Sequence, residues 1–200
     1  MLRLSLLLLL ALTASGGQAV ELTLLYGGQD GGQLEHIDSG SRLSFAPAPV
    51  RGLIIGSPLN ADQGLELLYS RQQTRLQQGE VAVPAGDLID LDIHYLHLGG
   101  TVLSEPYHGA QAFLSGGLGF SHFNPSPAGA DTENRASLSL GVGGRWMPTQ
   151  RVGLRLEARG FGSLFNSNMT LFCSGGCQFS ISGDMLYQYA LFAGLVVRLD

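Results

Sequence analysis

Alternation of apolar and polar side chains is the feature that most restricts the fold of this 200-residue chain. The clearest case, residues 151–162, has one face formed by Val152, Leu154, Leu156 and Ala158 and the other by Arg155, Glu157 and Arg159. Because successive side chains of a strand point to opposite faces of a sheet, this period of two residues predicts a β-strand. Residues 137–146 and 187–199 repeat the pattern, and helical periodicity is almost absent. The sequence therefore predicts an all-β fold.

Five further segments alternate less strictly and bring the expected number of strands to eight. They are residues 21–37, 42–56, 63–75, 88–98 and 110–123. Pro47 and Pro49 cannot donate hydrogen bonds to a neighbouring strand, so we expect them to interrupt the second of these segments. The connections alternate between short ones and longer ones rich in Gly, Ser, Pro or Asn. Short turns at one end and long loops at the other are typical of barrels that cross the bacterial outer membrane.

The N-terminus has the layout of a secretory signal peptide. Arg3 precedes an apolar run over residues 4–12, and small residues follow up to Ala19. The run is shorter than the roughly 20 residues that a membrane-spanning helix needs, so we expect export and cleavage after Ala19 instead of anchoring. The expected organisation is a signal peptide over residues 1–19 and one barrel domain over residues 20–200.

The polar face of the strands indicates which side of the barrel meets water. Charged residues make up only 14% of the chain and lysine is absent, whereas a water-exposed surface carries many charged side chains. In residues 137–146 the polar face is mainly serine and glycine, which suit the crowded interior of an eight-stranded barrel. Tyr107, Trp146 and Tyr187 fall near expected strand ends, where aromatic girdles contact the membrane interface. We expect an eight-stranded antiparallel up-and-down transmembrane β-barrel; a soluble periplasmic lipocalin-like carrier is the alternative.

Five strand segments carry a resemblance to a known family. They are Glu66–Gln72, His94–Thr101, Gly116–Phe120, Gly153–Gly160 and Ala193–Leu199. They resemble the small eight-stranded outer-membrane β-barrels of Gram-negative bacteria, of the OmpA, OmpX and OmpW type. The resemblance implies residence in the cell outer membrane, surrounding outer-membrane lipid, and recognition of the C-terminal strand by the outer-membrane assembly machinery. Family members commonly end on an aromatic residue, whereas this chain ends Leu199-Asp200.

The two cysteines, Cys173 and Cys177, lie four positions apart in the last long connection. An exported chain with one pair of cysteines is expected to form a disulfide in the oxidising periplasm. Such a small ring contributes about 2 kcal/mol at best. A metal site is the alternative, but two thiols without a nearby histidine make a poor ligand set.

Charged side chains on the polar face are candidates for a network inside the barrel. They are Asp90, Asp92, His94, Arg155, Glu157 and Arg159. One interpretation is a polar lumen that selects or gates a solute. The other, which we favour, is a packed ion-pair network that plugs the barrel, because eight strands leave little free bore and buried charges must be paired.

The sequence restricts the function of the protein less than it restricts the fold. The net charge of −5 and the absence of a basic cluster argue against nucleic acid as a partner. No pattern of residues predicts a catalytic set, a cofactor site or a metal site, so we expect a monomeric barrel with a structural or surface-interaction role and no enzymatic activity. The alternatives are a narrow conduit for small or hydrophobic solutes and an outer-membrane lipid hydrolase or acyltransferase, although no Ser/His/acid motif supports the enzyme.

Overall fold

The computed structural model describes residues 19–36, 42–78, 90–126, 132–165, 170–171, 179–180 and 185–199. Within these ranges, eight long strands form the wall of a barrel: β1 (Val20–Gly31), β4 (Ala48–Pro58), β5 (Gln63–Gln78), β6 (Asp90–Leu103), β7 (Ala110–Ser126), β8 (Glu133–Trp146), β9 (Val152–Leu164) and β12 (Met185–Leu199). Four short strands lie beyond one end: β2 (Gln33–His36), β3 (Arg42–Phe45), β10 (Thr170–Leu171) and β11 (Phe179–Ser180). None of the described residues forms a helix long and apolar enough to cross a membrane.

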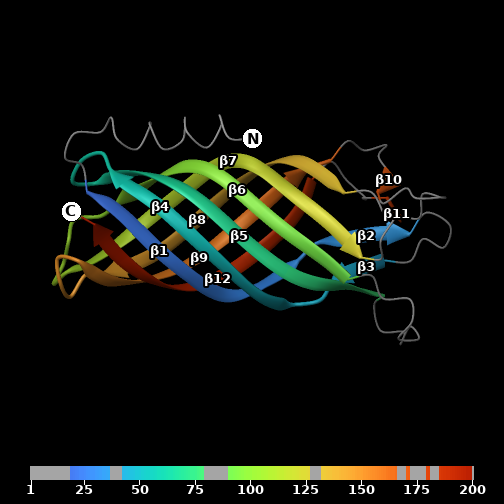
Figure 1. Ribbon diagram of the computed structural model, residues 1–200, viewed down its shortest axis with the longest axis horizontal. Coiled ribbons are helices and arrows are strands. Elements are labelled where there is room, and N and C mark those ends of the chain that lie inside the picture. Colours follow the sequence, from blue (N-terminus) through green and yellow to red (C-terminus); the bar gives the residue numbers. More distant parts are fainter. Residues whose placement is uncertain are drawn as a thin grey trace, which may run out of the picture.

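The sheet closes because the first and last strands pair with each other (Figure 1). Each strand of the wall runs antiparallel to its neighbours, and β1 pairs with β4 on one side and with β12 on the other. Opposite residues at the seam run from Val20 with Leu199 to Gly31 with Gln188. The predicted all-β, eight-stranded antiparallel barrel is confirmed. The predicted signal peptide lies outside the described residues, apart from Ala19, and stays a prediction.

The two ends of the barrel differ. The connections of residues 59–62, 104–109 and 147–151 are short and lie at the end where β1 begins and β12 ends (Figure 1). At the other end, the β2–β3 hairpin extends beyond the wall, β3 pairs with β5, and β11 pairs with β2. Pro47 lies in the gap between β3 and β4, as predicted, whereas Pro49 lies within β4 opposite Gly28. The two strands expected over residues 21–37 and 42–56 are therefore present. The first is interrupted at Gly32 and the second at residues 46–47.

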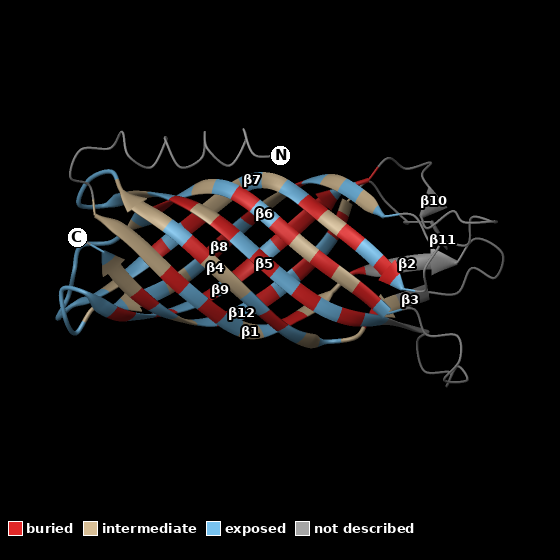
Figure 2. Ribbon diagram, viewed as in Figure 1, coloured by how far each residue is buried: buried red, intermediate tan, exposed pale blue. Residues whose placement is uncertain are grey.

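Burial alternates along nearly every strand of the wall (Figure 2). Large apolar side chains cover the outer face, among them Leu24, Tyr69, Leu98, Leu118, Phe120, Leu140, Leu156, Tyr187 and Leu191. For example, Leu118 is 71% exposed and Leu156 is 66% exposed, although both lie in the middle of strands. The outer face therefore has the composition of a surface that contacts lipid. The side chains that the alternation assigns to the outside on β8, β9 and β12 do lie there.

The lumen is filled by side chains. Its half nearer the long loops is mainly apolar, and Tyr95 and Phe161 stack at its centre with ring centroids 4.3 Å apart. Around them lie Val50, Leu68, Ile93, Phe123, Leu186 and Phe192, all buried. The other half holds charged groups. The sequence indicated polar and small residues inside and did not indicate this apolar half.

The turn between β6 and β7 has an unusual backbone conformation that a single substitution can test. Tyr107 and Ala110 exchange two backbone hydrogen bonds, of 2.8 and 2.9 Å, across His108 (φ 49°) and Gly109 (φ 78°). Two positive φ angles define a type I′ turn, in which glycine is favoured because it has no Cβ.

We predict that Gly109→Ala destabilises the barrel by about 1–2 kcal/mol, measured as a lower urea midpoint of the folded protein. An added Cβ at Gly109 would lie 3.2 Å from the carbonyl oxygen of Met147. The matched control is Gly64→Ala, whose Cβ makes only an ordinary 3.5 Å contact with the carbonyl oxygen of Ser57. Equal midpoints for the two variants would contradict the turn assignment.

Candidate functional site

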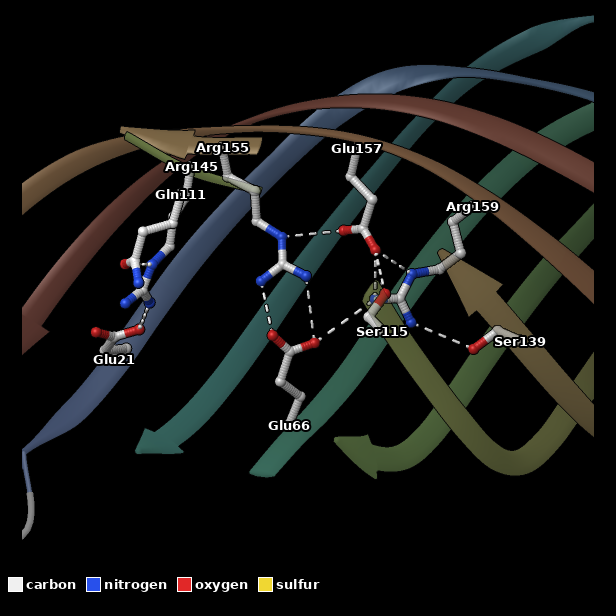
Figure 3. A network of polar contacts seen from close by, with 9 residues as sticks. All are labelled: Glu21, Glu66, Gln111, Ser115, Ser139, Arg145, Arg155, Glu157 and Arg159. Atoms are coloured by element: carbon white, nitrogen blue, oxygen red, sulfur yellow. Dashed lines mark hydrogen bonds and ion pairs between the residues drawn. The ribbon is translucent and has the colours of Figure 1, made fainter. Parts of the chain in front are cut away.

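The charged half of the lumen is built on strand β9. Its alternation directs Arg155, Glu157 and Arg159 inward, where they are 6%, 3% and 3% exposed. Glu66 of β5 reaches them from the other side of the lumen (Figure 3). Two guanidinium groups and two carboxylates therefore meet in one layer, and their formal charges cancel.

The contacts within this layer are short and shared. Arg155 donates to Glu66 at 2.7 and 3.3 Å and to Glu157 at 3.0 Å. Arg159 lies 2.6 Å from Glu157 and 3.6 Å from Glu66, so each arginine contacts both acids. The Ser115 hydroxyl donates to Glu157 at 2.7 Å, which gives that carboxylate a third partner. Buried charges persist only when they are paired and hydrogen-bonded in this way.

Small residues on the neighbouring strands make room for the network. A Cβ at Gly141 of β8 would lie 2.4 Å from Glu157 Oε1 and 2.5 Å from Ser115 Oγ. Ser139 on the same strand accepts a hydrogen bond of 3.2 Å from Arg159. The phenyl ring of Phe113 packs against Arg155, with its centroid 4.2 Å from the guanidinium carbon. The serine and glycine of the polar face therefore serve the packing of long charged side chains.

A second ion-pair cluster lies at the short-turn end of the lumen. Glu21 of β1 accepts hydrogen bonds from Arg198 at 2.6 and 3.0 Å and from Arg145 at 3.2 Å. Gln111 accepts from Arg145 at 3.0 Å. Glu21 and Arg198 are directly opposite at the seam between the first and last strands. The cluster thus connects β1, β12 and β8 where the barrel closes.

A cavity of about 40 Å³ lies between the two clusters, lined in part by Glu21, Glu66, Arg145 and Arg155. A cavity of this size holds one or a few water molecules and no larger solute.

His97 marks the boundary between the charged and apolar halves. Its ring nitrogens lie 2.9 Å from Ser139 Oγ and 2.7 Å from Ser137 Oγ. Its ring also lies against those of Tyr95 and Phe161, at centroid distances of 5.6 and 5.7 Å. Both polar atoms of this buried ring are satisfied by serine hydroxyls, so the histidine is a packing element of the lumen.

The prediction for Asp90, Asp92 and His94 is wrong. They lie on the outer face of β6, because they share the alternation of the exposed residues Leu96 and Leu98. Asp92 and Asp90 form ion pairs there with Arg71 and Arg75 of β5. His94 lies 2.9 Å from the hydroxyl oxygen of Tyr69 and 3.3 Å from Asp92. Of the predicted lumen set, only the three residues of β9 lie in the lumen.

Sequence reasoning also missed several partners of the network. Glu66, Ser115, Arg145, Arg198 and Glu21 all point inward. For Glu66 a signal existed, since it alternates with the outward-facing Leu65, Leu67 and Tyr69. Cys173 and Cys177 lie outside the described residues, and their disulfide stays a prediction. In the described ranges, no group of three His, Cys, Asp or Glu residues could hold a metal ion.

Known structures share this architecture, although the sequences are distant. No protein-family model matches the chain, and no curated protein matches it either. Neisserial surface protein A is 14% identical, with a TM-score of 0.61 over 92% of this chain and 98% of that protein. The outer membrane protein OprG of Pseudomonas aeruginosa is 11% identical, with a TM-score of 0.61 over 91% of this chain and 96% of that protein. The chain has the fold of a small outer-membrane β-barrel.

We predict that Glu157→Gln destabilises the barrel by about 3–5 kcal/mol, because it leaves Arg155 and Arg159 buried with one acid between them. The measurement is urea unfolding of the folded barrel in detergent. The control is Asp90→Asn, which removes an exposed ion pair with Arg75 and should cost less than about 1 kcal/mol. A Glu157→Gln variant as stable as the control would show that the network does not hold the lumen together.

Proposed function

We propose that the protein is an outer-membrane β-barrel with a structural or surface-interaction role, and that it does not conduct solutes. The observation that carries this proposal is the filled lumen. Arg155, Glu157 and Arg159 occupy one half and the Tyr95–Phe161 stack the other. A conduit of this width would need a continuous path between its ends, and both halves of the described lumen place buried side chains across it.

The outer face supports residence in a membrane. A soluble lipocalin-like carrier encloses its apolar surface and keeps room inside for a ligand. This barrel has apolar side chains such as Leu118 and Leu140 outside, and ion pairs and packed aromatic rings occupy its interior. Such an exterior is unfavourable in water and favourable in a bilayer. The periplasmic carrier is therefore the weaker proposal.

The proposal includes no catalytic activity. Of the histidines whose side chains the structure describes, only His97 is buried in the lumen, and serine hydroxyls contact both of its ring nitrogens. A triad needs an acid that orients the histidine and a nucleophile that a substrate can reach, and this buried arrangement supplies neither. The long connections at one end of the barrel are the segments that a surface-interaction role would use.

The test is planar-bilayer recording of the purified barrel beside a known open porin. Before recording, boiled and unboiled samples are compared by gel electrophoresis in detergent, because a folded barrel resists unfolding until it is heated. We expect a mobility shift between the two samples and no stepwise conductance above the bilayer baseline. Reproducible steps that grow with salt concentration would favour the conduit. A chain without a mobility shift that stays soluble would favour the carrier.

A further inference from the structure

A row of polar and cationic side chains crosses the outer face of four neighbouring strands. Directly opposite residues on β4, β5, β6 and β7 are Arg51, Arg71, His94 and His122. All four alternate with buried residues and so point outward. Opposite side chains on one face of an antiparallel pair have Cβ atoms about 5 Å apart. The row is therefore a continuous feature of the surface.

The row begins where the apolar outer surface ends. On β4 and β5, Leu53 and Tyr69 lie two positions closer to the short-turn end than Arg51 and Arg71. On β1, Tyr26 lies directly opposite Arg51 and is 59% exposed. Tyrosine is enriched where the hydrocarbon core meets the headgroups. Arg51 and Arg71 are thus at headgroup depth, on the side of the long loops.

The side chain of Arg51 has no hydrogen bond or ion pair with any other residue in the described ranges, and it is exposed. Arg71 contacts Asp92 through Nε and Nη2, which leaves its Nη1 donors available. Like charges directly opposite each other in a sheet are unfavourable. The pair Arg51–Arg71 is such a case, and Asp92 neutralises only one of its two charges. One net positive charge remains on this pair of arginines.

An anion that contacts both guanidinium groups would remove this imbalance. Guanidinium forks fit phosphate oxygens, and such charge-assisted hydrogen bonds are stronger than neutral ones. At headgroup depth the abundant anion is the phosphate of a lipid. We propose that Arg51 and Arg71 together bind the phosphate of a phosphorylated lipid in the leaflet next to the long loops, while Asp92 holds Arg71 in position. This inference rests on the proposed residence in the outer membrane.

The test uses native mass spectrometry of the folded barrel in detergent micelles, titrated with a phosphatidic acid or with the diacylglycerol that has the same acyl chains. We expect the wild-type protein to prefer the phosphatidic acid. We expect the double variant Arg51→Gln/Arg71→Gln to bind it about tenfold or more weakly, because two charged donors are lost. Binding of the diacylglycerol should be the same in both proteins.

The matched control is Arg75→Gln. Arg75 is an outward-facing arginine of the same strand, paired with Asp90, and its removal should leave phosphatidic acid affinity within about twofold of wild type. Equal affinity for the two lipids, or an equal loss in the control, would overturn the proposal. Displacement of the lipid by millimolar inorganic phosphate would show a site for free phosphate instead. Boiled and unboiled portions of the same samples are also compared by gel electrophoresis in detergent. A normal mobility shift without lipid preference contradicts this inference alone. A missing shift contradicts the proposed function.

Discussion

Pairing of the first strand with the last is the interaction on which the rest of this structure depends. Hydrogen bonds between β1 and β12 leave the wall without an open edge, so every strand has two neighbours and an apolar exterior becomes compatible with lipid. Closure at eight strands also fixes a narrow interior that only side chains fill. The ion pair between Glu21 and Arg198 lies on this seam. It adds a specific contact at the one junction whose partners are farthest apart in the chain.

A narrow interior explains why the lumen is divided. Long arginine and glutamate side chains reach each other across it, and the two-plus-two arrangement of Arg155, Arg159, Glu66 and Glu157 leaves no buried charge without a partner. Such a network costs free energy for the removal of water from its ions, which the ion pairs and serine hydrogen bonds offset. Aromatic and aliphatic side chains occupy most of the other half, where no ions need partners. Buried side chains therefore occupy both halves of the lumen within the described residues.

The fold was predictable because alternation is a local property. On β8, β9 and β12 the side chains that the sequence assigns to the outer face do lie there, since a period of two residues can be read along each strand by itself. Asp90, Asp92 and His94 were assigned to the lumen because they are charged, although their alternation with Tyr95 and His97 places them outside. Local alternation was the better guide, because ionic side chains are also stable outside once they lie beyond the apolar surface.

Partners within the lumen could not be predicted in the same way. Arg155 and Glu66 are 89 positions apart in the chain, and Arg145 and Glu21 are 124 apart. Which side chains meet across the lumen depends on the register of all the pairs between them, and a shift of one residue would exchange inside and outside. The apolar half of the lumen could not be predicted for a similar reason. Phe161 and Phe192 lie on the inward face expected from the alternation of β9 and β12, whereas Tyr95 lies on the face opposite to the one that the lumen assignment of His94 implied. Nothing local indicates that three inward positions from three strands converge.

The most direct test of this account asks which face of the wall contacts lipid. Trp146 is the single tryptophan, so a Trp146→Phe background allows one new tryptophan at a chosen position. Leu118→Trp on the outer face and Phe161→Trp in the lumen are compared in bilayers that contain brominated lipids, which quench tryptophan fluorescence on contact. The account predicts strong quenching at position 118 and little at position 161. Quenching at position 161 with none at position 118 would contradict it, because the apolar face would then enclose the lumen.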